Sequence, residues 1–393
     1  MIPEIRKKFN NDFSEKVYHD FLDDLNSVLK YPTGFRVCET PLFLSHELTN
    51  ELIRACEDVI SQIKTEEFIK RSEAAIPQHL KVPNDFDHPP FLQLDFAITK
   101  SEDKFLPKLI ELQAFPSLYG FQVYLNETIR KYFDIPVGFN SYFSGLNKTA
   151  YRALLTKLIV GNQDPENVIL LEIEPEKQKT RIDFAATEEL TGVTTVCLSK
   201  IKKRGKKIFY SKDGREIQVK RIYNRVIFDE LERKNLKFDF DFRDEIEAEW
   251  VGHPNWFFKI SKFSLPMLKG NYVPDCYFLN ELDKYPKNLN DFVLKPLFSF
   301  AGLGVDVDVT KEKLDAIAIR NNYILQQKVN YAPLLETPDG YSKTEIRMMF
   351  LWENKNEKPL LVNNLIRTSK GKMMGVDFNK NQTWIGSSIA YHP

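Results

Sequence analysis

A lysine and a loop of small residues near the end of the chain could bind a phosphate group. Two β-rich runs, 292–294 and 305–309, flank this loop. The candidate phosphate-binding residues at the end of the first run and in the loop are Lys295, Ser299, Gly302 and Gly304. Glycine and serine let backbone N–H groups approach a phosphate closely, and lysine adds a positive charge. A plain hairpin turn is the alternative interpretation of the same residues.

The segment that follows could hold an adenine ring. Residues 311–320 predict a short helix, and the run 323–329, YILQQKV, predicts an apolar strand that ends in polar residues. Apolar walls suit the ring, and backbone groups at a strand end suit its amine edge. The candidate residues on this side are Gln326, Gln327 and Val329.

Acidic and amide side chains earlier in the chain could hold a divalent metal. The alternating runs 91–98 and 107–113 predict two neighbouring strands joined by a charged turn. Such a pair would place Asp95 beside Glu111, with Gln113 on the same face as Glu111. These hard oxygen ligands suit Mg²⁺, which takes few protein groups and keeps the rest of its shell for phosphate and water. An exposed strand face bearing two acids is the alternative.

Apolar periodicity predicts the elements that would position these residues. Helices are expected at 8–30, 48–69, 121–133, 148–160 and 183–190. Further strands are expected at 168–172, 194–198, 257–262, 345–352 and 360–367, with a hairpin turned by Asp213-Gly214. Helices alternating with strands in this way indicate a chain of the α/β (α+β) class.

The order of lysine, glycine loop, helix and apolar strand resembles that of ATP-grasp enzymes. The pattern Leu-Asp-Phe, a polar turn, then Pro-Lys-Leu-Ile-Glu-x-Gln-x-x-Pro-Ser-Leu is similar to the Mg²⁺ strands of glutathionylspermidine synthetase and eukaryotic glutathione synthetase. Those enzymes are circularly permuted ATP-grasp ligases, in which the metal strands precede the ATP lysines. The resemblance covers about residues 91–393 as short motifs in this permuted order.

The resemblance implies an ATP-grasp fold, circularly permuted, with an α/β substrate domain like a pre-ATP-grasp domain. Residues 1–145 would hold N-terminal helices and the metal-binding strands. Residues 146–255 would form the α/β substrate-side domain. Residues 256–393 would carry the ATP-binding lysines, the phosphate hairpin and the closing strands.

The resemblance also implies roles for single residues. Lys262 would lie near the α-phosphate of ATP, and Lys295 near the β- and γ-phosphates. Arg347 and Arg367 are the candidate catalytic arginines, and the segment Asn-Leu-Ile-Arg367-Thr-Ser is similar to one whose arginine meets a substrate carboxylate. Arginine suits that work because its planar fork binds a carboxylate bidentately. The other substrate-side residues are Ser117 and Arg225, and cross-strand pairing with acids is the alternative for Arg347 and Arg367.

Two substitutions depart from the family pattern. Gln93 stands where the family has an arginine, and Gln113 stands where it has an asparagine. Losing one preorganised donor typically slows a reaction by on the order of a hundredfold or more. Arg347, Arg367 or the arginines near 221–225 must therefore supply that charge, or the chemistry is slowed or changed.

The function implied is that of an ATP-dependent carboxylate–amine ligase acting through an acyl-phosphate intermediate, with ATP and Mg²⁺. Its partners would be a small-molecule or peptide carboxylate and an amine, and relatives of this type are often homodimers. One alternative is a weakened or non-catalytic ATP-binding module on the same fold. Another is a small-molecule kinase.

Composition narrows the remaining classes. With 55 basic and 55 acidic residues, the net charge is formally zero, which argues against a nucleic-acid-binding surface. No apolar run reaches the eighteen or so residues of a membrane span. The four cysteines lie far apart, which predicts reduced thiols in a cytoplasmic protein; they are Cys38, Cys56, Cys197 and Cys276.

Overall fold

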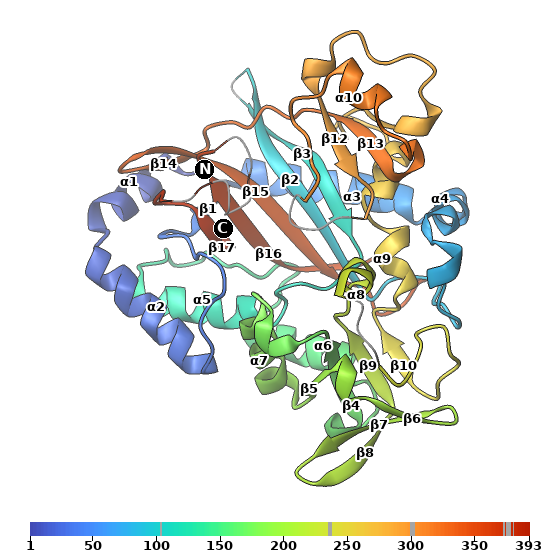
Figure 1. Cartoon of the computed structure of the whole chain (residues 1–393). Coiled ribbons are helices and arrows are strands. Elements are labelled where there is room, and N and C mark those ends of the chain that lie inside the picture. Colours follow the sequence, from blue (N-terminus) through green and yellow to red (C-terminus); the bar gives the residue numbers. More distant parts are fainter. Residues whose placement is uncertain (103, 235–237, 299–302, 372–373, 375–378, 380) are drawn as a thin grey trace.

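A six-stranded antiparallel sheet occupies the middle of the protein in the computed structural model (Figure 1). The structure describes residues 1–393 except 103, 235–237, 299–302, 372–373, 375–378 and 380, so the predicted loop residues Ser299 and Gly302 lie outside the described residues. The strand order is β17-β16-β15-β2-β3, with β14 paired to β15. The bounds are β2 (Phe91–Ser101), β3 (Lys104–Gln113), β14 (Leu335–Thr337), β15 (Gly340–Leu351), β16 (Leu360–Ser369) and β17 (Gly386–Ser388).

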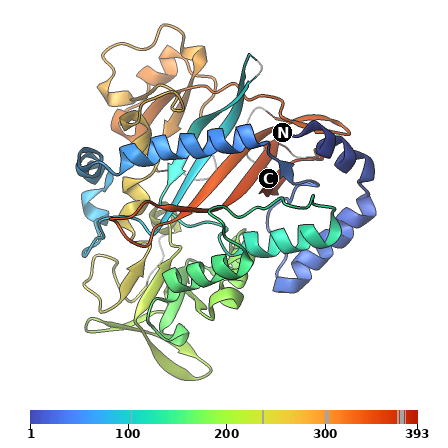
Figure 2. The ribbon, with the colours of Figure 1, turned by 180° about the vertical axis from the view of Figure 1, so that it is seen from behind.

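Alternation along these strands separates a helix-covered face from a polar face. On β2, Leu92, Leu94 and Phe96 pack against α3 (His46–Ile63), which runs across the near side of the sheet in Figure 2. Side chains point to opposite faces of a sheet at successive positions. Gln93 and Asp95 therefore lie on the other face, and that face carries the candidate site.

The N-terminal helices are shorter than the sequence periodicity predicts. The expected helix 8–30 is two helices, α1 (Pro3–Asp12) and α2 (Glu15–Leu29), and the expected helix 48–69 is α3 followed by α4 (Glu66–Ser72). Thr65 begins α4 by accepting a hydrogen bond from the N–H of Phe68 at 3.2 Å. Such capping residues favour a new helix start, which apolar spacing alone does not reveal. No helix within the described residues is both long and apolar enough to cross a lipid bilayer.

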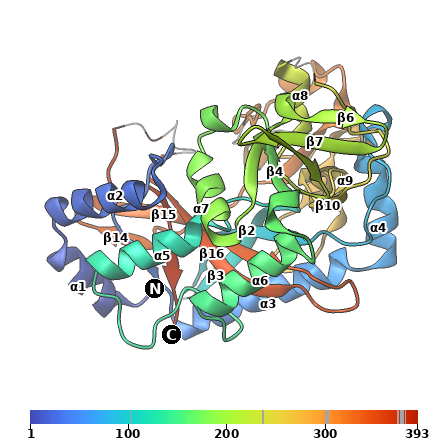
Figure 3. The same cartoon turned by 90° about the horizontal axis from the view of Figure 1, so that it is seen from below.

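A four-stranded parallel sheet lies on one side of the central sheet (Figures 1 and 3). Its order is β10-β9-β4-β5, and α7 connects β4 to β5. The chain leaves β4 toward β5 and later returns as β9 on the other side of β4, which makes the carboxyl ends of β4 and β9 a topological switch point. The elements are α5 (Phe121–Tyr132), α6 (Lys148–Val160), β4 (Val168–Glu172), α7 (Arg181–Thr191), β5 (Thr194–Cys197), the hairpin sheet β6 (Lys202–Arg204), β7 (Lys207–Lys212) and β8 (Arg215–Val219), β9 (Arg221–Asn224), α8 (Phe228–Lys234) and β10 (Glu249–Val251).

A smaller antiparallel sheet lies on the opposite side, with the order β11-β13-β12 (Figure 1). It consists of β11 (Cys276–Phe278), β12 (Phe292–Pro296) and β13 (Tyr323–Gln327), with α10 (Lys311–Asp315) beside it. The strand expected at 305–309 is wrong. In this run only Asp306 forms a β-bridge, to Leu294. The carboxylate of Asp306 accepts the N–H of Asp308 at 2.8 Å and turns the chain locally, so no strand continues.

The strand expected at 257–262 is also wrong. Residues 255–259 form the helix α9 (Asn255–Lys259), and a 3₁₀ turn spans Lys262–Met267. Ser261 starts that turn by accepting the N–H of Phe263 at 3.2 Å. All five residues of α9 are buried, so no apolar periodicity was available to distinguish a helix from a strand.

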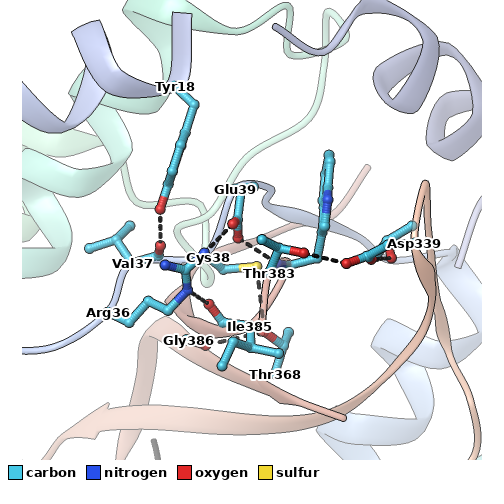
Figure 4. Close-up of polar contacts among 12 residues, drawn as sticks. Tyr18, Arg36, Val37, Cys38, Glu39, Asp339, Thr368, Thr383, Ile385 and Gly386 are labelled. Carbon is cyan, nitrogen blue, oxygen red and sulfur yellow. Dashed lines mark hydrogen bonds and ion pairs between the residues drawn. The ribbon is translucent and has the colours of Figure 1, made fainter. Parts of the chain in front are cut away.

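The two ends of the chain are joined by a parallel strand pair. β1 (Leu42–Phe43) pairs with β18 (Ala390–Tyr391), and Figure 4 shows the segment before β1 lying against Ile385 and Gly386. Cys38 donates its N–H to Ser387 O at 2.8 Å, and the carboxylate of Glu39 accepts the N–H of Trp384 at 2.8 Å. These contacts fix the N-terminal segment to the edge of the central sheet.

Gly386 lies tightly against Arg36 where these segments meet, and Gly386→Ala is expected to destabilise the protein by about 2 kcal/mol or more. A Cβ there would lie 2.5 Å from Arg36 O, and the residue has a φ of +120°. Gly340→Ala is the matched control, because Gly340 has a φ of +111° and open space around its Cβ position. Urea unfolding should show a clearly larger loss for Gly386→Ala, and equal losses would contradict the tight contact.

Candidate functional site

Asp95 lies in the middle of the polar face and is held by two arginines. On the neighbouring strand β15, Arg347 stands directly opposite Asp95. Its Nε and Nη2 donate to the two oxygens of Asp95 at 2.6 and 2.7 Å, and Arg367 Nη2 donates to Oδ2 at 2.7 Å. Burial opposes ionisation of Asp95, which is 1% exposed, but the two guanidinium groups outweigh it and lower its pKa.

Arg367 extends this arrangement to a second acid. Its Nη2 lies 2.7 Å from Glu345 Oε2, and the hydroxyl of Tyr331 donates to the other oxygen of Glu345. Burial works against the charge on Arg367, but Glu345 and Asp95 together raise its pKa. Burial and Glu345 raise the pKa of Tyr331. Cross-strand pairing with acids, the alternative for Arg347 and Arg367, is therefore what the structure shows.

Two lysines from separate elements converge on Glu111, which pairs with Asp95 in the register of β2 and β3. Lys262 Nζ lies 3.1 Å from Glu111 Oε1, and Lys295 Nζ donates to Ile110 O at 3.2 Å. Burial is the main influence on both Glu111 and Lys295. It lowers the pKa of Lys295, whereas Lys262 and Lys295 overcome it at Glu111 and lower the pKa of that carboxyl.

These seven side chains form one charged cluster: Asp95, Glu111, Lys262, Lys295, Glu345, Arg347 and Arg367. Three carboxylates face four cations, so the charged cluster has a formal charge of plus one. Buried cations in excess of their partners attract an anion, because desolvation strengthens every charge interaction there. The arrangement suits a polyphosphate or a carboxylate.

Gln113 and Gln93 complete this face of the sheet. Gln113 donates its side-chain N–H to Gln93 Oε1, and Gln93 Nε2 donates to Ser117 O at 2.8 Å. Ser117 thus contributes its backbone carbonyl to the site. Its side chain takes no part in these bonds.

The donor set fits a divalent cation that arrives with phosphates. Within the described part of the chain, no three histidine, cysteine, aspartate or glutamate side chains come together as a metal site. Both oxygens of Asp95 already accept arginine N–H groups, which leaves Glu111 and the oxygen of Gln113 as the accessible ligands. Mg²⁺ is commonly bound through one or two carboxylates plus substrate phosphates, so this set is sufficient.

A hollow beside Glu111, Gln113 and Lys262 has a volume of about 20 Å³, which is room for one water molecule. Leu297 and Phe298, which follow β12, border the hollow as well. Leu109 donates its N–H to Tyr272 O at 2.7 Å, and Gln326 Nε2 donates to Leu109 O at 3.4 Å. The bonds from Gln326 to Leu109 O and from Lys295 to Ile110 O hold β3 against the small sheet.

The other residues predicted on the nucleotide side are more scattered. Gln326 is buried on β13 beside β3, but Gln327 is exposed and Val329 lies beyond the strand. Gly304 has a φ of +73°, and a Cβ there would lie 2.8 Å from Pro296. Its glycine identity is thus required by the turn itself.

Another buried cation, outside the charged cluster, lies where β9 ends. Arg225 is 3% exposed, and its guanidinium stands 4.9 Å from the ring of Phe115 and 5.4 Å from that of Phe184. Among the residues that the structure describes, its Nε and Nη1 are buried and have no hydrogen-bond partner. Buried N–H groups are normally hydrogen-bonded, so this guanidinium has N–H groups to offer to an acceptor at the switch point.

Sequence reasoning missed Glu172 and Asp183, which accompany Arg225. Asp183 accepts the N–H groups of Leu118, Gly120 and Phe121 at 3.0, 3.1 and 2.9 Å. Burial raises the pKa of Glu172 to about 8, although Arg225 opposes the shift. Their position at the carboxyl end of β4 and at the start of α7 was the available signal. Phe115 borders the hollow as well as Arg225 and so connects the two places.

Comparisons with known proteins support the fold alone. The structure of a glutathione synthetase-like effector from Globodera pallida in its apo form has a TM-score of 0.57 with this chain. The match covers 96% of both chains, with 10% sequence identity. No protein-family model and no curated protein matches the sequence. The chain thus has a mixed α/β fold similar to that of a glutathione synthetase-like protein.

Proposed function

We propose that this protein is an ATP-dependent ligase that joins a carboxylate to an amine on a circularly permuted ATP-grasp fold. The observation that carries the proposal is the convergence of Lys262 and Lys295 on Glu111, beside an aspartate held by two arginines. The likeness in fold to a glutathione synthetase-like protein supports the same class.

Each part of the charged cluster has a role in this reaction. Lys262 and Lys295 would hold the polyphosphate, and Glu111 with Gln113 would hold Mg²⁺. When bound, Mg²⁺ neutralises phosphate charge and orients the transferring group. The protein needs no side-chain nucleophile, because positioning and charge stabilisation carry phosphoryl transfer.

The arginines would serve the carboxylate substrate. Asp95 fixes Arg347 through two hydrogen bonds, whereas the Arg367 side chain is 34% exposed and retains N–H groups for a ligand. An oxygen of the substrate carboxylate would attack the γ-phosphorus and release ADP. The amine nitrogen would then attack the acyl carbon, lose a proton and expel phosphate. Arg225 would bind a further anionic group of the same substrate.

Binding of a nucleotide would require the small sheet to move away from β3. The hollow holds about one water, so the bonds from Gln326 and Lys295 to the backbone of β3 must open to admit ATP. Opening and closing of a lid around the nucleotide is common in enzymes that exclude water from phosphoryl transfer.

A non-catalytic ATP-binding module is the second candidate. Gln93 is fully buried and uses both ends of its amide in hydrogen bonds, so it supplies no positive charge to the site. A module of this kind would hold ATP without turnover under any mixture of substrates.

The experiment is a calorimetric titration of MgATP into the wild type and Lys295→Ala. We expect magnesium-dependent binding that weakens by about tenfold to a hundredfold in the variant, since a charge-assisted bond contributes roughly 1.5–3 kcal/mol. Lys313→Ala is the matched control, because Lys313 in α10, beside the small sheet, pairs with Asp306 at the surface. Absence of nucleotide binding to the wild type would refute the proposal.

Turnover then distinguishes the candidates. The ligase releases ADP and phosphate only when both an acid and an amine are present. Steady ATP binding without ADP release in a broad acid and amine screen would favour the binding module. ADP release with a stable phosphoester product would instead indicate a kinase.

A further inference from the structure

Gln93 and Gln113 share a chain of hydrogen bonds that ends on the protein backbone. The two residues stand directly opposite each other on β2 and β3. Gln93 is fully buried, and its Nε2 donates to Ser117 O at 2.8 Å. Gln113 in turn donates its N–H to Gln93 Oε1. Each amide therefore has one neighbour that sets its orientation.

The backbone carbonyl fixes the direction of the whole chain of bonds. A carbonyl oxygen only accepts hydrogen bonds, so Gln93 must turn its NH₂ group toward Ser117. The oxygen of Gln93 then faces Gln113, so Gln113 must donate a hydrogen bond from its own NH₂ group. These hydrogen bonds assign the orientation of both amides, although the oxygen and the NH₂ group of an amide have nearly the same shape. The oxygen of Gln113 is left outside the chain of bonds.

We propose that Gln93 is a positioning residue that presents the oxygen of Gln113 as a ligand for a divalent cation beside Glu111. This inference rests on the proposed function, which places Mg²⁺ at Glu111 and Gln113. Glu111 and Gln113 border the same hollow, so an oxygen turned outward there adds a second hard donor. An amide in the opposite orientation would direct N–H groups at the cation and repel it.

The pair also explains why two unusual residues occur together. An arginine at position 93 could only donate hydrogen bonds, so it would engage the oxygen of Gln113 and withdraw it from the metal. A glutamine at position 93 accepts from Gln113 and frees that oxygen. Gln93 and Gln113 thus act as one unit. Neither side chain replaces the positive charge of the arginine that the family has at position 93.

The test measures metal affinity directly. Free Mn²⁺ is followed by electron paramagnetic resonance as it is titrated into the protein with saturating ADP, since Mn²⁺ prefers the same oxygen ligands as Mg²⁺. Gln93→Met should bind Mn²⁺ about tenfold to a hundredfold more weakly than the wild type, as is typical when a partner of a metal ligand is removed. Gln113→Met should lose at least as much affinity.

Gln122→Met is the matched control for loss of a buried amide. Gln122 is also fully buried and donates to a backbone carbonyl, that of Asn364, at 2.9 Å. Its Mn²⁺ affinity should equal that of the wild type. Adding Gln93→Met to Gln113→Met should cause no further loss, because neighbouring residues that act as a unit are not additive. If Gln93→Met fails to fold, Gln113→Met and Gln113→Asn, which shortens the reach to Gln93, decide the matter by the same measurement.

The outcomes separate this inference from the proposed function. If the wild type binds neither MgATP nor Mn²⁺, the proposed function itself fails. If the wild type binds both and Gln93→Met keeps its Mn²⁺ affinity within about twofold, the positioning role alone is refuted. Binding of nucleotide without Mn²⁺ would also overturn it.

Discussion

Arg347→Leu is expected to lower the free energy of unfolding by about 3–5 kcal/mol at pH 7, because it leaves a buried aspartate with half of its partners. Arg347 provides two of the three hydrogen bonds that Asp95 accepts from arginines, and Asp95 is almost completely buried. Replacing both residues, in Arg347→Leu with Asp95→Leu, should recover much of the loss, because no unpaired charge then remains.

The pH dependence of this loss follows from the aspartate. In the wild type, the pKa of Asp95 lies below its ordinary value of 3.8, so its contribution to stability is present above that value and is lost as the pH falls through the lower folded pKa. Without Arg347, the carboxyl becomes easier to protonate. The difference in the free energy of unfolding between the wild type and Arg347→Leu should therefore become smaller below about pH 4.

The measurement is urea unfolding of wild type and variants from pH 3 to pH 7. Arg243→Leu is the control, because Arg243 pairs with Asp241 on the surface through a similar arrangement of bonds. Its stability should be close to that of the wild type, since exposed ion pairs contribute little. If Arg347→Leu costs no more than Arg243→Leu, the charged cluster is not buried as described.

Glu172→Gln is expected to stabilise the protein increasingly as the pH rises. The folded pKa of Glu172 is about 8, against an ordinary value of 4.5, so the folded protein binds a proton that the unfolded chain releases. The wild type therefore loses stability from this group between about pH 4.5 and 8, by on the order of 5 kcal/mol in total. The neutral glutamine lacks this loss and still offers an oxygen to the N–H of Ile173, which Glu172 binds at 2.7 Å.

Unfolding at pH 5 and pH 8.5 tests this expectation. Wild type and Glu172→Gln should be nearly equal at pH 5 and should diverge at pH 8.5 in favour of the variant. Glu174→Gln is the neighbouring control, because hydrogen bonds from Lys177 and Lys234 lower the pKa of Glu174 to about 2. Its difference from the wild type should stay constant over the same range. A constant difference for Glu172→Gln as well would show that Glu172 ionises normally.

The strands of the central sheet were predictable because one face packs on helices. The alternating residues of 91–98 gave a period of two, and α6 begins and ends at the expected residues. Where burial is complete, as in α9, the pattern vanished and a strand was predicted in place of a helix. Local side-chain bonds explain the other error, since Asp306 turns the chain that a propensity for β structure would extend.

Part of the candidate site was predictable from local spacing, and part was not. The pairing of Asp95 with Glu111 follows from two strands joined by a short turn. The contacts of Arg347 and Arg367 with Asp95 depend on strands more than 200 residues later in the chain. Spacing along the sequence carries no information on such contacts. Glu172 was missed because its shifted pKa arises from burial, which one carboxylate at a strand end does not reveal.

The order of strands in the central sheet also bears on how the chain is made. β2 and β3 end by residue 113, but their partner β15 begins at residue 340 and the last pair needs residues 390–391. At about 5–20 residues per second, a ribosome needs on the order of 10–50 s to supply that partner. During this time one long side of the apolar β2 has no strand to pair with. We expect nascent chains of this protein to depend on chaperones that shield an open strand edge until synthesis is nearly complete.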